Sequence, residues 1–76
     1  MSITTVVCVF FAANPDEVLT NHDIGAKWDK SPEIVRKALE HAELKGWVAK
    51  DRKREGRIWK VYYRAGPRLL KEIGRG

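Results

Sequence analysis

The Lys and Arg residues of this chain are spaced in a way that suggests a chemical role. Five of the eight residues from 50 to 57 (KDRKREGR) are Lys or Arg, and the glycine in this segment indicates a turn. Residues 1–49 carry five basic and seven acidic side chains, a net charge of −2, whereas residues 50–76 carry ten basic and three acidic ones, a net charge of +7. This asymmetry favours a polyanionic partner that approaches the C-terminal third. The alternative is a charged surface that only keeps the protein soluble.

The residues that catalysis or metal binding would need are not grouped in the sequence. No nucleophile is paired with a base, and no glycine-rich loop suited to a phosphate is present. Cys8 is the single cysteine, and no His or Cys lies near it at zinc-ligand spacing. His22 and His41 fall in different predicted helices. We therefore expect no enzyme, no cofactor and no metal, and a reducing, cytoplasmic location.

The apolar segment from 6 to 13 has two interpretations that we reject. A signal peptide has a basic residue before its apolar segment, and this chain has none there. The segment is also too short to span a bilayer. We expect a soluble protein without a membrane partner, associated with the nucleoid if the source is bacterial or a phage.

The N-terminal segment is predicted to be a helix over residues 3–13, although its β-branched residues favour a strand. Five apolar residues recur at helical spacing after Ser2, a suitable N-cap: Ile3, Val6, Val7, Phe10 and Phe11. Cys8 and Val9 lie beside this stripe. They add apolar surface that would suit a dimer partner, or Cys8 is a small core residue.

Residues 14–46 predict a short strand and two more helices. Asn-Pro-Asp at 14–16 ends the first helix, and a short extended segment at 18–20 precedes a helix at 21–28. Thr20 or Asn21 can cap this helix, and Asp23 follows Thr20 at the spacing of a capping box. We expect Gly25 to allow close packing against the next helix, at 32–45, which begins with Ser31 and Pro32. Its expected core stripe is Ile34, Val35, Ala38, Leu39 and Ala42, and Gly46 is expected to end it.

Residues 47–64 predict a β-hairpin. Strands rich in aromatic and β-branched residues are expected at 47–50 and 57–63, joined by a basic loop at 51–56. Alternation places Trp59 on the core face of its strand and leaves Tyr62 as the exposed aromatic. Trp28 and Trp47 are also expected in the core, and the alternative for all three Trp residues is a platform on which nucleobases stack. A short helix at 67–73 completes a single α+β domain of three core helices, a short strand, the hairpin and this final helix.

This order of elements resembles the winged helix-turn-helix superfamily of DNA-binding proteins, in particular small MarR-like or phage-type regulators. The residues that carry the resemblance are LTNHDIGAKW (19–28), SPEIVRKALEHAELKGWV (31–48) and KDRKREGRIWKVYYRAG (50–66). A weaker resemblance is to the Zα domains, at His22-Asp23, Gly25, Lys27 and Trp59-Lys60. It ends at the recognition helix, where Arg36 and Glu40 replace an Asn and a Tyr, so we do not expect binding to left-handed DNA.

The winged-helix resemblance implies that the helix at 32–45 enters the major groove of double-stranded DNA and that the hairpin contacts phosphates or the minor groove. Ser31 would then contact a phosphate, Arg36 would read guanine, and Glu33 would accept a hydrogen bond from cytosine. The predicted DNA-binding residues are Lys30, Ser31, Glu33, Arg36, Lys37, Lys50, Arg52, Lys53, Arg54, Arg57 and Lys60. The simpler interpretations are a solvated helix face and a hairpin whose charges prevent edge-to-edge aggregation.

Two functions from different classes remain open. The first is a DNA-binding transcriptional regulator, expected to be a homodimer because symmetric half-sites double the base contacts of a small domain. The second is a winged-helix adaptor that binds a protein partner, which the acidic residues of the helix at 32–45 and the surplus apolar surface of the first helix would suit.

Overall fold

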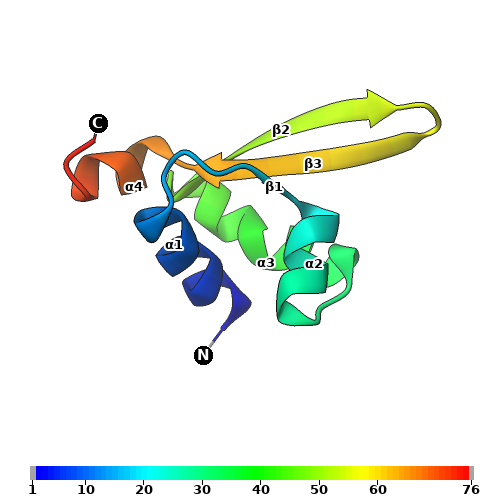
Figure 1. Cartoon of the computed structure of the whole chain (residues 1–76), viewed down its shortest axis with the longest axis horizontal. Coiled ribbons are helices and arrows are strands. Elements are labelled where there is room, and N and C mark those ends of the chain that lie inside the picture. Colours follow the sequence, from blue (N-terminus) through cyan, green and yellow to red (C-terminus); the bar gives the residue numbers. More distant parts are fainter. Residues whose placement is uncertain (1, 76) are drawn as a thin grey trace.

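The computed structural model describes residues 2–75, which form an α+β fold with four helices and a three-stranded antiparallel sheet (Figure 1). The elements are α1 (Ile3–Ala13), β1 (Leu19–Thr20), α2 (Asn21–Trp28), α3 (Pro32–Leu44), β2 (Val48–Glu55), β3 (Ile58–Ala65) and α4 (Pro67–Glu72). Their order is the expected one, and most bounds lie within two residues of the expected positions. Among these helices, none combines the length and the apolar character that crossing a membrane requires.

The first three helices begin at side-chain caps that the sequence indicated. The hydroxyls of Ser2, Thr20 and Ser31 accept hydrogen bonds from the backbone N–H three residues later, at 3.2, 3.0 and 3.2 Å. The Asp23 carboxylate also accepts the N–H of Thr20, which completes a capping box. Each cap satisfies a donor that the helix itself leaves free, so these starts are fixed by local chemistry.

The core lies between the sheet and the helices that pack against it (Figure 1). Its buried residues come from every element except β1, and they are Val7, Phe11, Ile24, Val35, Leu39, Ala42, Val48, Val61, Tyr63, Ala65 and Leu69. Two residues of the expected α3 stripe are not among them, because Ala38 is only partly buried and Ile34 is exposed. Ile34 is 52% exposed, because it lies at the edge of the stripe near the start of α3, where no neighbouring element covers it.

Strand β3 is the centre of the sheet, in the order β1-β3-β2. β1 is only two residues long, and Leu19 and Thr20 pair with Tyr63 and Tyr62. Beyond Thr20 the buried side chain of Asn21 continues the pairing, because its Oδ1 accepts the Val61 N–H at 3.4 Å. α2 can therefore begin directly at the end of β1 without leaving a buried donor of β3 unpaired.

The hairpin differs from the expected one in the length of its strands. Cross-strand pairing runs without interruption from Val48–Ala65 to Glu55–Ile58, so the segment 51–56, predicted to be a loop, is mostly strand. Only Gly56 and Arg57 form the turn, and Gly56 has φ of 63°. A glycine at the first central position is typical of a type II′ turn, which matches the twist of the strands. The charges of this segment indicated exposure, not an irregular backbone.

Two glycines allow backbone segments to approach each other closely. A Cβ at Gly66 would lie 2.2 Å from the carbonyl oxygen of Gly46, where the end of β3 passes the end of α3. A Cβ at Gly25 would lie 2.4 Å from the carbonyl oxygen of Lys30. Gly25 was expected to pack against the next helix, but its close neighbour is the α2–α3 turn, which folds back because Asp29 has a positive φ of 54°.

Replacing Gly66 with Ala is expected to lower the free energy of unfolding by about 3 kcal/mol, because the added methyl group meets backbone atoms that no rotamer change can move. The matched control is Gly74→Ala, where no atom lies within 4 Å of the added Cβ and only the positive φ is unfavourable. The free energy of unfolding of both variants is measured by urea denaturation, with circular dichroism as the signal. A larger loss for Gly74→Ala than for Gly66→Ala would contradict this role of Gly66.

Candidate functional site

The β2–β3 hairpin has two faces of different chemistry. Directly opposed residues share a face, so the pairing register assigns each side chain to one of them. The core-side face carries Val48, Lys50, Arg52, Arg54, Trp59, Val61, Tyr63 and Ala65. The outer face carries Ala49, Asp51, Lys53, Glu55, Ile58, Lys60, Tyr62 and Arg64. All acidic residues of the two strands therefore lie on the outer face.

Basic side chains of the outer face interact with neighbouring groups of the hairpin. The Lys60 Nζ lies 3.0 Å from a Glu55 carboxylate oxygen, and the Tyr62 hydroxyl donates to the same carboxylate. These contacts hold the pKa of Glu55 below its ordinary value, with the Tyr62 hydrogen bond as the largest cause. The ammonium group of Lys53 lies over the Tyr62 ring, 5.4 Å from its centroid. Positive charge on this face is thus partly neutralised within the protein.

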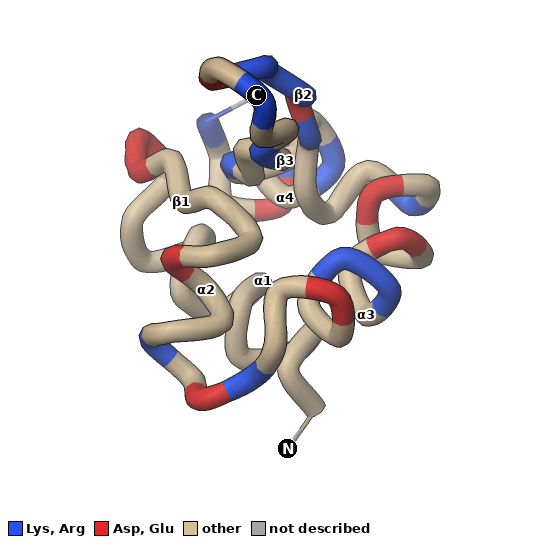
Figure 2. The backbone as a smooth tube through the Cα atoms, turned by 90° about the vertical axis from the view of Figure 1, so that its right-hand side faces the viewer, with Lys and Arg blue, Asp and Glu red and all other residues tan. Residues whose placement is uncertain are grey.

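The core-side face has three basic residues, Lys50, Arg52 and Arg54, and all three are exposed. Within residues 2–75, ion pairs join Arg36 to Glu33, Lys60 to Glu55 and Arg75 to Asp16, and none involves this face. Arg54 donates from Nε to the carbonyl oxygen of Gly56 at 2.8 Å, which braces the turn. The concentration of positive charge on the hairpin is visible in Figure 2, which looks toward its turn.

Trp59 is exposed, contrary to the prediction that it belongs to the core. It is on the core-side face, but the hairpin extends beyond the helices, and the last buried residue of that face is Val61. Trp59 is therefore 53% exposed, and the guanidinium of Arg52 lies over its ring, 5.2 Å from the centroid. Trp28 and Trp47 do pack against the core as predicted. Tyr62, predicted to be the exposed aromatic, is half-buried.

Helix α3 adjoins the core-side face at Tyr63. Burial raises the pKa of Tyr63, and the nearby charges of Arg36, Glu40 and Glu43 on α3 modify that shift. Arg36 is exposed, and its guanidinium bonds to Glu33 at 2.9 Å. This pairing raises the pKa of Arg36 and lowers that of Glu33. An exposed pair of this kind is weak enough to be exchanged for an external ligand.

The start of α3 places the other predicted contact residues at the surface. Lys30, Ser31 and Lys37 are all exposed. Pro32 has no N–H, and the Ile34 N–H is bonded to the Ser31 hydroxyl, so this helix start offers fewer free donors to a phosphate than an uncapped one. Exposed Ile34 lies on the same turn and was not predicted as a contact. The neighbouring charged residues Glu33 and Arg36 indicate that this side of the helix is exposed. The helical spacing of Ile34 nevertheless predicted that it faces the core.

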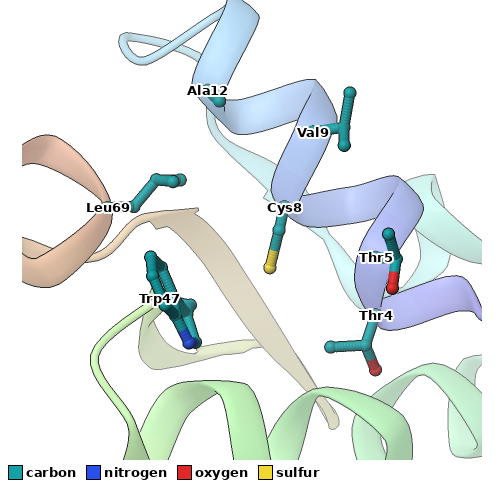
Figure 3. Close-up of a pocket in the computed structure, with 7 residues that line it drawn as sticks. All are labelled: Thr4, Thr5, Cys8, Val9, Ala12, Trp47 and Leu69. Carbon is teal, nitrogen blue, oxygen red and sulfur yellow. The ribbon is translucent and has the colours of Figure 1, made fainter. Parts of the chain in front are cut away.

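A second feature is a hollow of about 380 Å³ between α1, α4 and the residue that precedes β2 (Figure 3). Its lining is Thr4, Thr5, Cys8, Val9, Ala12, Trp47 and Leu69. The Cys8 sulfur points toward Trp47, and burial raises the pKa of the thiol, which therefore remains protonated at neutral pH. The Thr4 hydroxyl donates to the Ala38 carbonyl oxygen at 2.8 Å. The lining contains no acid or base, so the hollow suits apolar packing.

Metal ligands are not grouped in the part of the chain that the structure describes: no three His, Cys, Asp or Glu side chains come together. Comparison of the chain with the models of known protein families, with curated proteins and with solved structures found no match.

The contacts on the outer face predict the titration of Glu55. Its carboxyl pKa should lie below the ordinary value for Glu, and Tyr62→Phe should raise it, because the largest stabilising contact is removed. Because the pKa of Glu55 is lower in the folded protein than in the unfolded chain, ionised Glu55 stabilises the folded state at neutral pH. This contribution is lost as the pH falls through the folded pKa. Carbon-detected NMR titration of the side-chain carboxyl measures the shift. An unchanged pKa in the Tyr62→Phe variant would contradict the proposed cause.

Proposed function

We propose that this chain is a winged-helix domain that binds double-stranded DNA. The order of elements supports this proposal: three helices, a short strand before the second helix, and a C-terminal hairpin paired with that strand in a sheet of order β1-β3-β2. In such domains the third helix enters the major groove and the hairpin contacts the backbone. The domain would act as a transcriptional regulator.

The observation that carries the proposal is the core-side face of the hairpin. Lys50, Arg52 and Arg54 project from one side of one strand, and the acids of the hairpin lie on the other side. Residues two apart on a strand are about 7 Å apart, similar to the spacing of phosphates along one DNA strand. A row of such cations can contact successive phosphates. We therefore assign phosphate binding to this face rather than to the whole hairpin.

The position of α3 supports the same assignment. Its exposed residues near Tyr63 include Arg36, so the helix and the core-side face adjoin on one side of the molecule. Arg36 would leave Glu33 to bind guanine in a bidentate manner, and Ile34 would contact a thymine methyl group. Lys30 and Lys37 would contact phosphates. The mixed charge of α3, visible in Figure 2, makes the hairpin the larger electrostatic contribution.

Two double variants test this assignment with equal loss of charge. Arg52→Gln/Arg54→Gln should weaken binding to every duplex sequence and reduce the slope of log K against log salt by about 2, because two phosphate contacts are lost. Lys53→Gln/Lys60→Gln removes the same charge from the outer face and should have a smaller effect on both quantities. Fluorescence anisotropy over a series of salt concentrations measures them, and circular dichroism checks the fold.

Equal effects of the two double variants would contradict the assignment to one face. Undetectable binding of the unaltered protein to duplex DNA at low salt would overturn the proposal as a whole.

Base reading by α3 is tested with Arg36→Ala. This change should cost about 1–3 kcal/mol at preferred sites selected from random duplexes and much less at other sites, because only a preferred site offers guanine in register. Lys37→Ala is the control, since a phosphate contact should be lost equally on all sequences. An equal loss at all sites for Arg36→Ala would exclude its role in base reading.

A second candidate function, protein binding, is favoured by the hollow beside α1. Val9 is 60% exposed next to this hollow, and α1 has no charged residue along its length. An apolar patch of this kind is typical of an interface with another protein, including a second copy of the chain. A regulator would use this surface to form a homodimer, whereas an adaptor would use it without the DNA contacts described above.

A further inference from the structure

We propose that Trp59 is a stacking site for an unpaired nucleobase, so that the hairpin prefers a duplex that continues into a single strand. The inference rests on the proposed DNA binding and specifies its substrate. It starts from the position of Trp59, which lies beyond the core on the projecting half of the hairpin and is 53% exposed. A Trp at such a position contributes little to the core.

The surroundings of Trp59 suit a nucleotide. Arg54 is directly opposite Trp59 in the hairpin, and the Arg52 guanidinium lies over one face of the indole ring at 5.2 Å. A base can stack on the other face while these two cations bind the flanking phosphates. Aromatic rings beside basic groups are the usual platform of proteins that bind single strands, because every base offers a π face. A protein partner at this position would instead have to supply acidic side chains that pair with the two arginines.

The location of the platform restricts which bases it can reach. Bases within a duplex are stacked on their neighbours, and removing one from the stack costs free energy. A base in a single-stranded extension is already accessible. With α3 in the groove, the projecting hairpin extends along the DNA beyond the contacts of the helix, and its far half would meet the extension. The substrate is therefore a duplex with an adjoining unpaired strand.

The test compares one duplex in a blunt form with the same duplex carrying a six-nucleotide extension, in either polarity. The full chain should bind one of the extended forms about tenfold more tightly than the blunt form, the gain typical of one stacked base. Trp59→Ala should abolish this preference, so that the variant binds the extended and the blunt duplex with equal affinity. Trp59→Phe should retain part of it. Ile58→Ala, which removes an apolar residue that is 57% exposed on the outer face, is the matched control and should retain all of it.

The alternatives give different results. Equal affinity of the unaltered protein for blunt and extended duplexes would overturn the stacking site, and so would an equal loss on both forms in Trp59→Ala. A change in the sedimentation coefficient of Trp59→Ala without DNA would show that Trp59 contacts a second copy, which also overturns it. In each case binding of the blunt duplex that depends on Arg52 and Arg54 would leave the proposed function intact. Absence of all binding at low salt would remove both proposals.

Discussion

The pairing of β2 with β3 is the constraint on which the rest of this structure depends. The ladder joins eight residue pairs, but only its half nearest the helices is covered by the core. On the core-side face, Val61 and Tyr63 of β3 are buried opposite Arg52 and Lys50 of β2, and beyond this level the face continues with the exposed pair of Arg54 and Trp59. Because side chains alternate strictly along a strand, the register that fixes the core also fixes which charges face the side of α3.

The two faces of the hairpin show that one charged segment can form two surfaces of different electrostatic character. On the outer face, Glu55 forms a network with Lys60 and Tyr62 that partly neutralises the positive charge there. The core-side face has cations without acids on the same strands. A net charge cannot distinguish these arrangements, whereas the register does. The register places Arg52 and Arg54 together on the face that has no acidic residue.

The helices and their ends followed from local chemistry, which the sequence displays directly. Ser2, Thr20 and Ser31 each accept the N–H that their position in a capping motif requires, so the starts of α1, α2 and α3 were predictable. The predicted core stripes were largely right as well. Ile34 is the exposed member of these stripes, because periodicity indicates the direction of a side chain but not the width of the element that covers it.

The sequence by itself determined the α+β class, the order of the elements and the concentration of positive charge after residue 50. Only the tertiary structure decided how far the hairpin extends and where the core ends along it. The polar residues of segment 51–55 have the composition of a loop, and only their pairing with β3 identifies the segment as a strand. The exposure of Trp59 has the same origin. The alternation of side chains along β3 placed Trp59 on the core face. Its burial depends on whether a helix reaches that position, and none of the described helices does.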